Sequence, residues 1–402
     1  MFKRPELLAP AGDREKLQFA IHYGADAVYL GLKDYSLRGN IKGFDEQTLT
    51  EAIEFCRKNN KKVYVTVNIF AHNKDLKGIE RHFEFLNSVK PDGVILSDLG
   101  VLNIKKRIAR DIPVHISTQA NITNYESALF YQDLDVKRLI LSRELSLKEI
   151  EKIRKKVTIE LEMFVHGAIC ISYSGRCYLS SFLTYRSGNK GLCTHPCRWS
   201  YTLMEEKRQG EYFPVFEDEK GSYIMNSKDL CLIEYLPDLI DMGIDSFKIE
   251  GRMKGINYLS GVTHVYRKAI DAYVNDKDYE KDLFLKELLS FSSRGFTTGM
   301  LLGKQKFYDY NFDDKSSKIK TQLVGIVQKK LSRTKAEVAI KANLKKGETI
   351  YFLTPGYEEI PFEVKSMEKE GNPVDLARND WTVIMDVPPF VRELDISRKF
   401  IE

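Results

Sequence analysis

Short apolar runs, separated by helix-length amphipathic stretches, dominate the first 165 residues of the chain. Seven runs have a near-continuous apolar or β-branched character and lie at residues 6–11, 27–32, 62–70, 92–98, 113–118, 137–144 and 158–165. Between them, apolar residues recur three or four positions apart, as in REKLQFAIHYG and LTEAIEFCRKN, which is typical of helices with one buried face. This pattern predicts parallel strands covered on both faces by helices.

An eighth run, KIE at 248–250, lies in a phrase that echoes one near the start of the chain. In YGADAVYLG (23–31) and in MGIDSFKIEG (242–251), a glycine closes a helix and a short apolar strand follows, as a left-handed helix C-cap requires. Eight strand–helix units in series predict a (β/α)8 barrel, a TIM-like α/β fold. A doubly wound open sheet is the competing arrangement.

The spacing of the units is irregular in one place, where about 80 residues separate the seventh strand from the eighth. We expect an insertion here, at about 166–235, on the face where barrel enzymes carry their active sites.

From about residue 320, short alternating runs separated by turn residues predict five or so strands in a small β-barrel or sandwich. The expected domains are therefore a barrel over 1–275, a helical connector over 276–319 and a small β-barrel over 320–402.

Composition is that of a soluble globular protein, with 43% hydrophobic and 30% charged residues. No window approaches the roughly 18 consecutive apolar residues of a membrane span, and the first residues lack an apolar run of signal-peptide length. We therefore expect a cytoplasmic protein with no membrane partner. The net charge of +5 permits a nucleic-acid partner without arguing for one.

Four of the six cysteines stand within 28 positions, at Cys170, Cys177, Cys193 and Cys197. In a cytoplasmic protein, clustered cysteines more often bind metal than form disulfides. The spacing C-x6-C-x15-C-x3-C fits structural zinc poorly, because zinc sites usually pair ligands two to four residues apart. An iron–sulfur cluster accepts looser spacing, since a cubane spreads its ligands over four iron corners. Zinc is the alternative, with His166 or His195 replacing one cysteine.

The run ELEMFVHGAICISYSGRCYLSS (160–181) resembles the signature of the peptidase U32 family. ELLAPAG near the start, STQANITN (117–124), GLCTHPCRW (191–199) and KIEGRMK (248–254) match other blocks of that family in its order. The resemblance implies that the four cysteines bind a 4Fe–4S cluster. It also implies RNA hydroxylation, because better-understood members resemble hydroxylation factors for tRNA wobble uridine, an rRNA cytidine and ubiquinone. The compact length and C-terminal β-domain look most like the prephenate-dependent tRNA branch, which yields 5-hydroxyuridine at position 34.

The peptidase label of the family finds little support among the residues. A metalloprotease is commonly marked by HExxH, and a serine hydrolase by G-x-S-x-G; neither motif occurs in the sequence. A cysteine protease needs a free thiolate beside a histidine, but the clustered thiols are expected to be ligands. Cys56 and Cys231 look like helix-face core residues.

Basic and aromatic residues interleave around the cysteines. The basic residues are Arg176, Arg186, Lys190 and Arg198, and the aromatic residues are Tyr173, Tyr178, Phe182, Tyr185 and Trp199. This mixture is typical of single-stranded RNA binding. The alternative is that the rings only wrap the cluster to keep water out. Arginine also grips carboxylates at two points, which suits prephenate, a dicarboxylate.

Further candidate residues follow the ends of predicted strands, where a barrel points side chains into its mouth. The expected substrate-binding residues are Gln119, Asn121, Arg143, Arg176, Arg198 and Arg252, and the expected catalytic residues are His166 and Glu250. His166 could transfer protons near neutral pH or hydrogen-bond a cluster sulfide. Each residue alone is equally well explained as a satisfied polar group or a salt-bridge member.

These observations predict an enzyme that hydroxylates uridine 34 of tRNA, with a 4Fe–4S cluster as cofactor and prephenate as co-substrate. A paired homologue of the same family is a further candidate partner. Three other functions stay open at this point. They are an rRNA cytidine hydroxylase of the same family, a collagenase-like peptidase, and a non-enzymatic RNA-binding factor with a structural metal.

Overall fold

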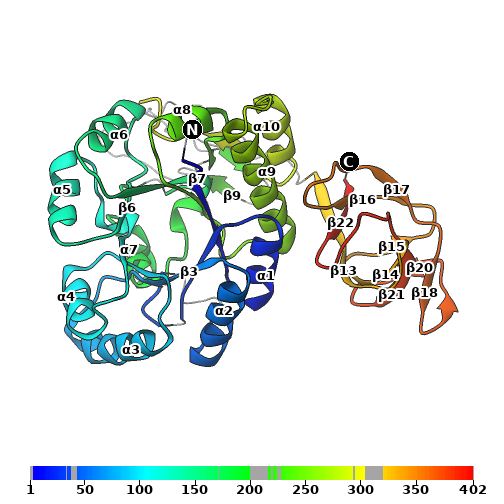
Figure 1. Ribbon diagram of the computed structural model, residues 1–402, viewed down its shortest axis with the longest axis horizontal. Coiled ribbons are helices and arrows are strands. Elements are labelled where there is room, and N and C mark those ends of the chain that lie inside the picture. The colour runs from blue at the N-terminus through cyan, green and yellow to red at the C-terminus, as the bar shows by residue number, and fades with distance from the viewer. Residues whose placement is uncertain are drawn as a thin grey trace.

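A computed structural model describes most of the chain in two units, a helix-wrapped barrel and a smaller β-sheet unit at the C-terminus (Figure 1). The described residues are 3–32, 34–37, 43–170, 172–199, 216–218, 221–223, 228–292, 295–303 and 320–401. No helix in these ranges is both long and apolar enough to cross a membrane.

Eight parallel strands close into a barrel in the first unit. They are β1 (Glu6–Pro10), β2 (Ala27–Leu30), β3 (Lys62–Val67), β4 (Gly93–Leu96), β5 (Val114–Ile116), β6 (Arg138–Ile140), β7 (Glu160–Ala168) and β11 (Ser246–Ile249). Each of the first seven pairs with the next, and β11 pairs in parallel with both β7 and β1, which closes the ring. The predicted TIM-like barrel is confirmed, and the open doubly wound sheet is excluded because both of its would-be edges are paired.

Helices cover the outside of the barrel (Figure 1). They are α1 (Arg14–His22), α2 (Glu46–Lys58), α3 (Leu76–Val89), α4 (Leu99–Ile108), α5 (Tyr125–Asp133), α6 (Leu147–Arg154), α8 (Leu236–Asp241) and α9 (Ile256–Val274), with α10 (Lys281–Leu289) packed on α9. Side chains cap several of them, as when Asp13 accepts a hydrogen bond from the Lys16 N–H at the start of α1. Gly24 and Gly243 take φ angles of 101° and 83°, which confirms the left-handed turns predicted at both echoed phrases.

The long connection between β7 and β11 holds the insertion. It contains α7 (Leu179–Thr184), the short 3₁₀ helices η3 (Gly188–Lys190), η4 (Pro196–Arg198) and η5 (Ile233–Tyr235), the hairpin β8 (Phe216–Asp218) and β9 (Gly221–Tyr223), and β10 (Asp229–Cys231). β10 pairs antiparallel with the end of β7, and β12 (Phe296–Thr297) pairs with β10. These two short strands extend the barrel sheet beyond the ring, and no sequence pattern predicted them.

The barrel interior carries a buried ion network in addition to its apolar core. The Arg138 guanidinium donates to carboxylates of Glu6 at 2.6 Å, Glu160 at 2.7 Å and Glu162 at 2.9 Å. The Lys248 ammonium donates to the other oxygen of Glu162 at 2.9 Å. Arg138, Glu162 and Lys248 are buried in mutual contact, the arrangement that makes burial of ionised groups tolerable, while Glu6 and Glu160 are partly buried.

The C-terminal unit is an antiparallel half-barrel with its own core. Its main sheet has the order β17-β16-β22-β13-β14-β21-β18-β19, formed by β13 (Thr321–Lys330), β14 (Lys335–Ile340), β16 (Thr349–Leu353), β17 (Pro361–Glu363), β18 (Met367–Lys369), β19 (Asn372–Pro373), β21 (Thr382–Asp386) and β22 (Ile396–Phe400). β15 (Leu344–Lys345) pairs separately with β20 (Leu376–Ala377). The small β-unit predicted from about residue 320 is confirmed, but its main sheet has eight strands in place of the predicted five or so. The buried Tyr23 hydroxyl joins the two units, donating to the Leu353 carbonyl at 2.9 Å and accepting from the Ile396 N–H at 3.0 Å.

Candidate functional site

The four clustered cysteines line a single cavity of about 370 Å³, which we call the cysteine cavity. Its walls also include residues at or just after the ends of β5, β6, β7 and β11, namely Gln119, Arg143, Glu144, Ala168, Ile169, Glu250, Gly251, Met253 and Lys254. The cavity therefore lies at the carboxyl ends of the barrel strands, where barrel enzymes place their chemistry.

None of the four clustered cysteines forms a disulfide, nor do Cys56 and Cys231, which lie buried elsewhere in the described part of the chain. The backbone N–H of His195 donates to the Cys193 sulfur at 3.4 Å. Within the described ranges, no three His, Cys, Asp or Glu side chains converge closely enough to hold a metal ion. A single zinc ion needs its ligands to meet at one point, whereas a cubane cluster spreads four cysteines over four corners. The four thiols that line this cavity are the ligands that either group would use.

Residues 170–199, which we call the cysteine segment, are fastened to the barrel rim on one side at β5 and β6. The Ser174 N–H donates to the Glu144 carboxylate at 2.5 Å, and the Thr118 hydroxyl donates to the Ser174 hydroxyl at 3.4 Å. Gly175 packs directly on the backbone of Gln119. These contacts fix the loop that carries Cys170 and Cys177.

The other half of the cysteine segment is held at the loop after β3. The Phe70 N–H donates to the Asn189 carbonyl at 3.1 Å, and the Lys190 ammonium pairs with Asp75 at 2.9 Å. The segment thus reaches from the β5–β6 rim to the β3 loop, across the mouth of the barrel.

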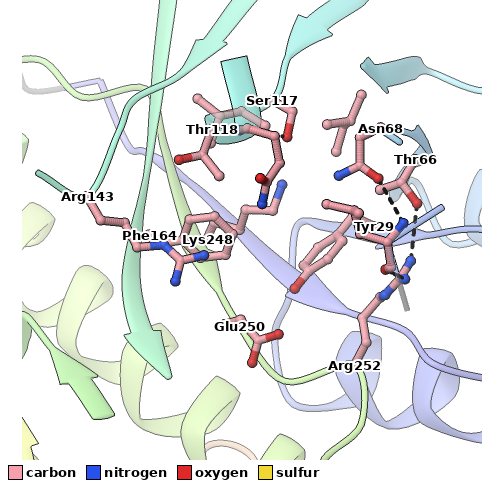
Figure 2. Close-up of a pocket in the computed structure, with 14 residues that line it drawn as sticks. Tyr29, Thr66, Asn68, Ser117, Thr118, Arg143, Phe164, Lys248, Glu250 and Arg252 are labelled. Atoms are coloured by element: carbon pink, nitrogen blue, oxygen red, sulfur yellow. Dashed lines mark hydrogen bonds between the residues drawn. The ribbon is translucent and has the colours of Figure 1, made fainter. Parts of the chain in front are cut away.

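A second cavity of about 70 Å³, the mouth cavity, lies inside the barrel opening (Figure 2). It shares Leu37, Gln119, Arg143 and Glu250 with the cysteine cavity, so the two adjoin. Its remaining walls are Tyr29, Thr66, Asn68, Ile95, Ser117, Thr118, Ile140, Phe164, Lys248 and Arg252. A group held in the mouth cavity would therefore lie beside the cysteines.

Arg143 stands at the junction of the two cavities. One terminal nitrogen donates to the Ala168 carbonyl at 2.9 Å, and the guanidinium lies 4.4 Å from the centre of the Phe164 ring. Its Nε is buried and has no hydrogen-bond partner within the described part of the chain; the same holds for Oε2 of Glu144. A buried cationic donor without a partner is costly, so this atom is suited to meeting an anionic ligand.

The other two cations of the mouth cavity already have protein partners. Arg252 donates to the Ser36 hydroxyl at 2.9 Å and the Thr66 hydroxyl at 3.1 Å. Lys248 is bonded to Glu162 and lies 4.4 Å from the centre of the Tyr29 ring, and burial lowers its pKa. Sequence reasoning missed Lys248, although a lysine inside an apolar strand was a visible signal.

Of the predicted substrate-binding residues, Gln119, Arg143 and Arg252 line these cavities, as does the predicted catalytic Glu250. Asn121 is outside both sets of lining residues and lies 3.4 Å from the Ser142 hydroxyl. Arg176 is exposed on the rim. The side chain of Arg198 falls outside the described residues.

His166 lies apart from these groups, buried in a box of aromatic rings. The ring centres of Tyr258, Tyr266 and Phe296 are 5.2 to 5.9 Å from that of His166. Burial, together with the positive charge of Lys254, lowers the pKa of His166 to about 3, so its ring is neutral near physiological pH. His166 is absent from the described linings of both cavities, and this placement lends the predicted proton-transfer role no support.

The aromatic side chains of the cysteine segment face solvent to a large extent. Tyr173, Tyr178, Phe182, Tyr185 and Trp199 are all exposed. Tyr173 also lines the cysteine cavity, whereas the other four rings are absent from its described lining.

Comparison with known proteins places this geometry in a family context. The model of peptidase family U32 matches residues 12–310, and that of its C-terminal domain matches residues 320–398. tRNA hydroxylation protein P1 of Bacillus subtilis is 38% identical over 95% of this chain and 91% of its own length. An uncharacterized protease of Methanocaldococcus jannaschii is 41% identical over 97% of both chains. The 23S rRNA 5-hydroxycytidine C2501 synthase of Escherichia coli is 36% identical over 68% of this chain but 40% of its own length.

Proposed function

Because the chain belongs to peptidase family U32, we propose that it is an RNA-modifying enzyme that hydroxylates tRNA, converting wobble uridine 34 to 5-hydroxyuridine. The observation that carries the proposal is its similarity, across nearly the whole of both chains, to a relative named for tRNA hydroxylation. A cavity lined by four thiols and continuous with a barrel mouth supports the same conclusion. We place this activity in the cytoplasm, where thiols stay reduced.

We infer that Cys170, Cys177, Cys193 and Cys197 hold a 4Fe–4S cluster. When bound, such a cluster supplies one-electron chemistry beside the reacting base. The contribution of the chain is to hold the four thiols in the lining of one cavity and to direct the His195 N–H at the Cys193 sulfur. Hydrogen bonds to ligand sulfurs tune the potential of such sites.

We further propose that the mouth cavity binds prephenate, as hydroxyl source or precursor. Arg143 is the described group best suited to a carboxylate, since its buried Nε lacks a partner. Figure 2 shows Arg143, Lys248 and Glu250 around the same space, with Tyr29 and Phe164 as apolar walls for a ring. Arg252 instead holds Ser36 and Thr66 in place, and Glu250, between the two cavities, is the candidate proton acceptor.

The alternative functions are less well supported. The rRNA synthase shares only 40% of its length with this chain, whereas the tRNA-named relative shares nearly all of it. A peptidase needs an activated nucleophile or an open metal site with a base, and the sequence has neither HExxH nor G-x-S-x-G. An RNA-binding factor without catalysis would leave the polar lining of the mouth cavity without a role.

Mass spectrometry of nucleosides from a deletion strain tests the proposal. Nucleosides derived from 5-hydroxyuridine should disappear from tRNA, return with the wild-type gene, and stay absent with a gene carrying Cys177→Ser. Any paralogue should also be deleted, so that it cannot supply the modification. Complementation with and without a paired homologue then shows whether the activity requires that homologue. If the tRNA nucleosides persist while 5-hydroxycytidine leaves rRNA, the rRNA alternative is correct. If the protein binds tRNA and neither nucleoside changes, the chain is a binding factor.

A further inference from the structure

The cysteine segment presents five large aromatic side chains to solvent. The exposed fractions are 58% for Tyr173, 70% for Tyr178, 70% for Phe182, 95% for Tyr185 and 43% for Trp199. Rings of this size bury most of their surface in a folded chain, and a group of them left exposed in one short segment marks an interaction surface. The segment borders the cysteine cavity, because Tyr173 and Leu179, the neighbour of Tyr178, line it.

The inner face of α7 is anchored, which holds its outer face in a fixed orientation. The buried Ser180 hydroxyl donates to the Arg186 carbonyl at 2.6 Å and accepts from the Thr194 N–H at 3.2 Å. Tyr178 and Phe182 stand four residues apart, so they share one face of the helical turn. Tyr185 follows, with its N–H bonded to the Ser181 carbonyl at 3.1 Å. The three rings are therefore displayed on a rigid support.

Charge identifies the kind of partner. Residues 170–199 include four arginines and lysines and no aspartate or glutamate, whereas the whole chain has a net charge of only +5. Arg176 and Arg186, on either side of α7, are exposed. Exposed aromatic rings between cations are the elements of single-strand binding, where rings stack on bases and cations meet phosphates.

We propose that Tyr178, Phe182 and Tyr185 form a stacking surface for unpaired nucleotides of an RNA loop. The surface holds bases that neighbour the target, so that the target base can turn out of the loop into the cysteine cavity. This inference rests on the proposed function, since it takes the loop to be that of a tRNA anticodon. It adds that single-stranded nucleotides are gripped by ring stacking at α7.

Fluorescence anisotropy with a labelled anticodon stem–loop tests the surface, using the full-length protein. The variants are Tyr178→Ala, Phe182→Ala and Tyr185→Ala, with Phe130→Ala as control, because Phe130 on α5 is 55% exposed and outside the segment. Each lost stack should weaken binding about 5- to 150-fold. The control should bind like the wild type, and a duplex of the same sequence should bind all variants alike.

Salt dependence separates stacking from charge. The aromatic variants should keep the wild-type slope of log affinity against log salt, whereas Arg186→Ala should lower it by roughly 0.7 for each lost phosphate contact. Tight stem–loop binding by Tyr178→Ala, Phe182→Ala and Tyr185→Ala would overturn the stacking surface and leave the proposed function standing. Loss of self-association in these variants, with RNA binding intact, would instead identify an interface between copies of this chain. If the wild type binds no RNA and modifies none, the proposed function itself fails.

Discussion

Gly175 lies so close to Gln119 that a β-carbon on the glycine would stand 2.1 Å from the Gln119 carbonyl oxygen. Gly175 also takes a φ of 73°, a conformation that other residues rarely adopt. The contact joins the loop between Cys170 and Cys177 to the end of β5. Only glycine allows the two backbones to approach this closely, so the positions of Cys170 and Cys177 depend on it.

The variant Gly175→Ala should push the cysteine loop off the barrel rim and lose most of its iron and acid-labile sulfide, with the barrel still folded. Gly371→Ala is the matched control, because Gly371 has a φ of 81° but open space around its α-carbon. The control should be destabilised by only about 1–2 kcal/mol, the conformational cost of a side chain at positive φ, and should keep its iron. Metal analysis measures the iron content, absorbance near 400 nm reports the cluster, and thermal unfolding reports the fold. Equal iron in both variants would show that this contact does not position the ligands.

Replacing Arg143 by glutamine should weaken the interaction with prephenate. A hydrogen bond to a charged group contributes about 1.5–3 kcal/mol, which corresponds to a roughly 10- to 150-fold higher KM for prephenate. Arg57→Gln is the control, because Arg57 lies on α2, donates to the Lys90 carbonyl and is absent from the described linings of both cavities. The measurement is prephenate-dependent tRNA hydroxylation in vitro. An unchanged KM in Arg143→Gln would place the carboxylate elsewhere.

His166 should make folding less favourable as the solution becomes acidic. Its pKa is about 3 in the folded protein because burial and Lys254 disfavour the imidazolium, whereas an unfolded histidine titrates near 6.5. Below about pH 6.5, His166 therefore binds a proton in the unfolded state but stays neutral in the folded state. Stability falls by about 1.4 kcal/mol for each pH unit between the two pKa values.

Urea unfolding at pH 7 and pH 5 checks this titration. The wild type should lose about 2 kcal/mol more over that interval than His166→Gln, which has no group to titrate there. The other buried histidines contribute equally to both proteins, so they cancel in the comparison. Identical pH dependence in the two proteins would mean that the His166 ring is accessible to protons and would revive its predicted catalytic role.

The repeating pattern predicted the barrel because each strand is a self-contained apolar run. The eight predicted runs overlap the eight barrel strands, from Glu6–Pro10 to Ser246–Ile249. β10 and β12 were missed because two or three residues display no period, and their pairing with β7 depends on the tertiary fold.

The residues of the candidate site could be predicted where their type and local spacing in the sequence indicate a function. Cysteine spacing and strand-end positions identified the four thiols, Gln119, Arg143 and Glu250 as neighbours. Periodicity does not describe the inside of a barrel, so the contacts of Lys248 with Glu162 and of Arg138 with Glu6 were not foreseen. Burial also could not be predicted for His166, because its aromatic box is assembled from β7, α9 and β12.

Tyr23→Phe should weaken the interface between the two units without changing the cysteine cavity. The change leaves the buried Leu353 carbonyl and Ile396 N–H without their hydroxyl partner, at a cost of about 1–3 kcal/mol for each unsatisfied group. Tyr273→Phe is the control, because its hydroxyl bonds Asp241 in an exposed position, where water can replace it. Limited proteolysis and urea unfolding should detect early release of the C-terminal half-barrel in Tyr23→Phe alone. Iron content should stay at the wild-type level, since the cysteine cavity lies at the barrel mouth. Loss of iron together with the interface would mean that the half-barrel helps to shape the site.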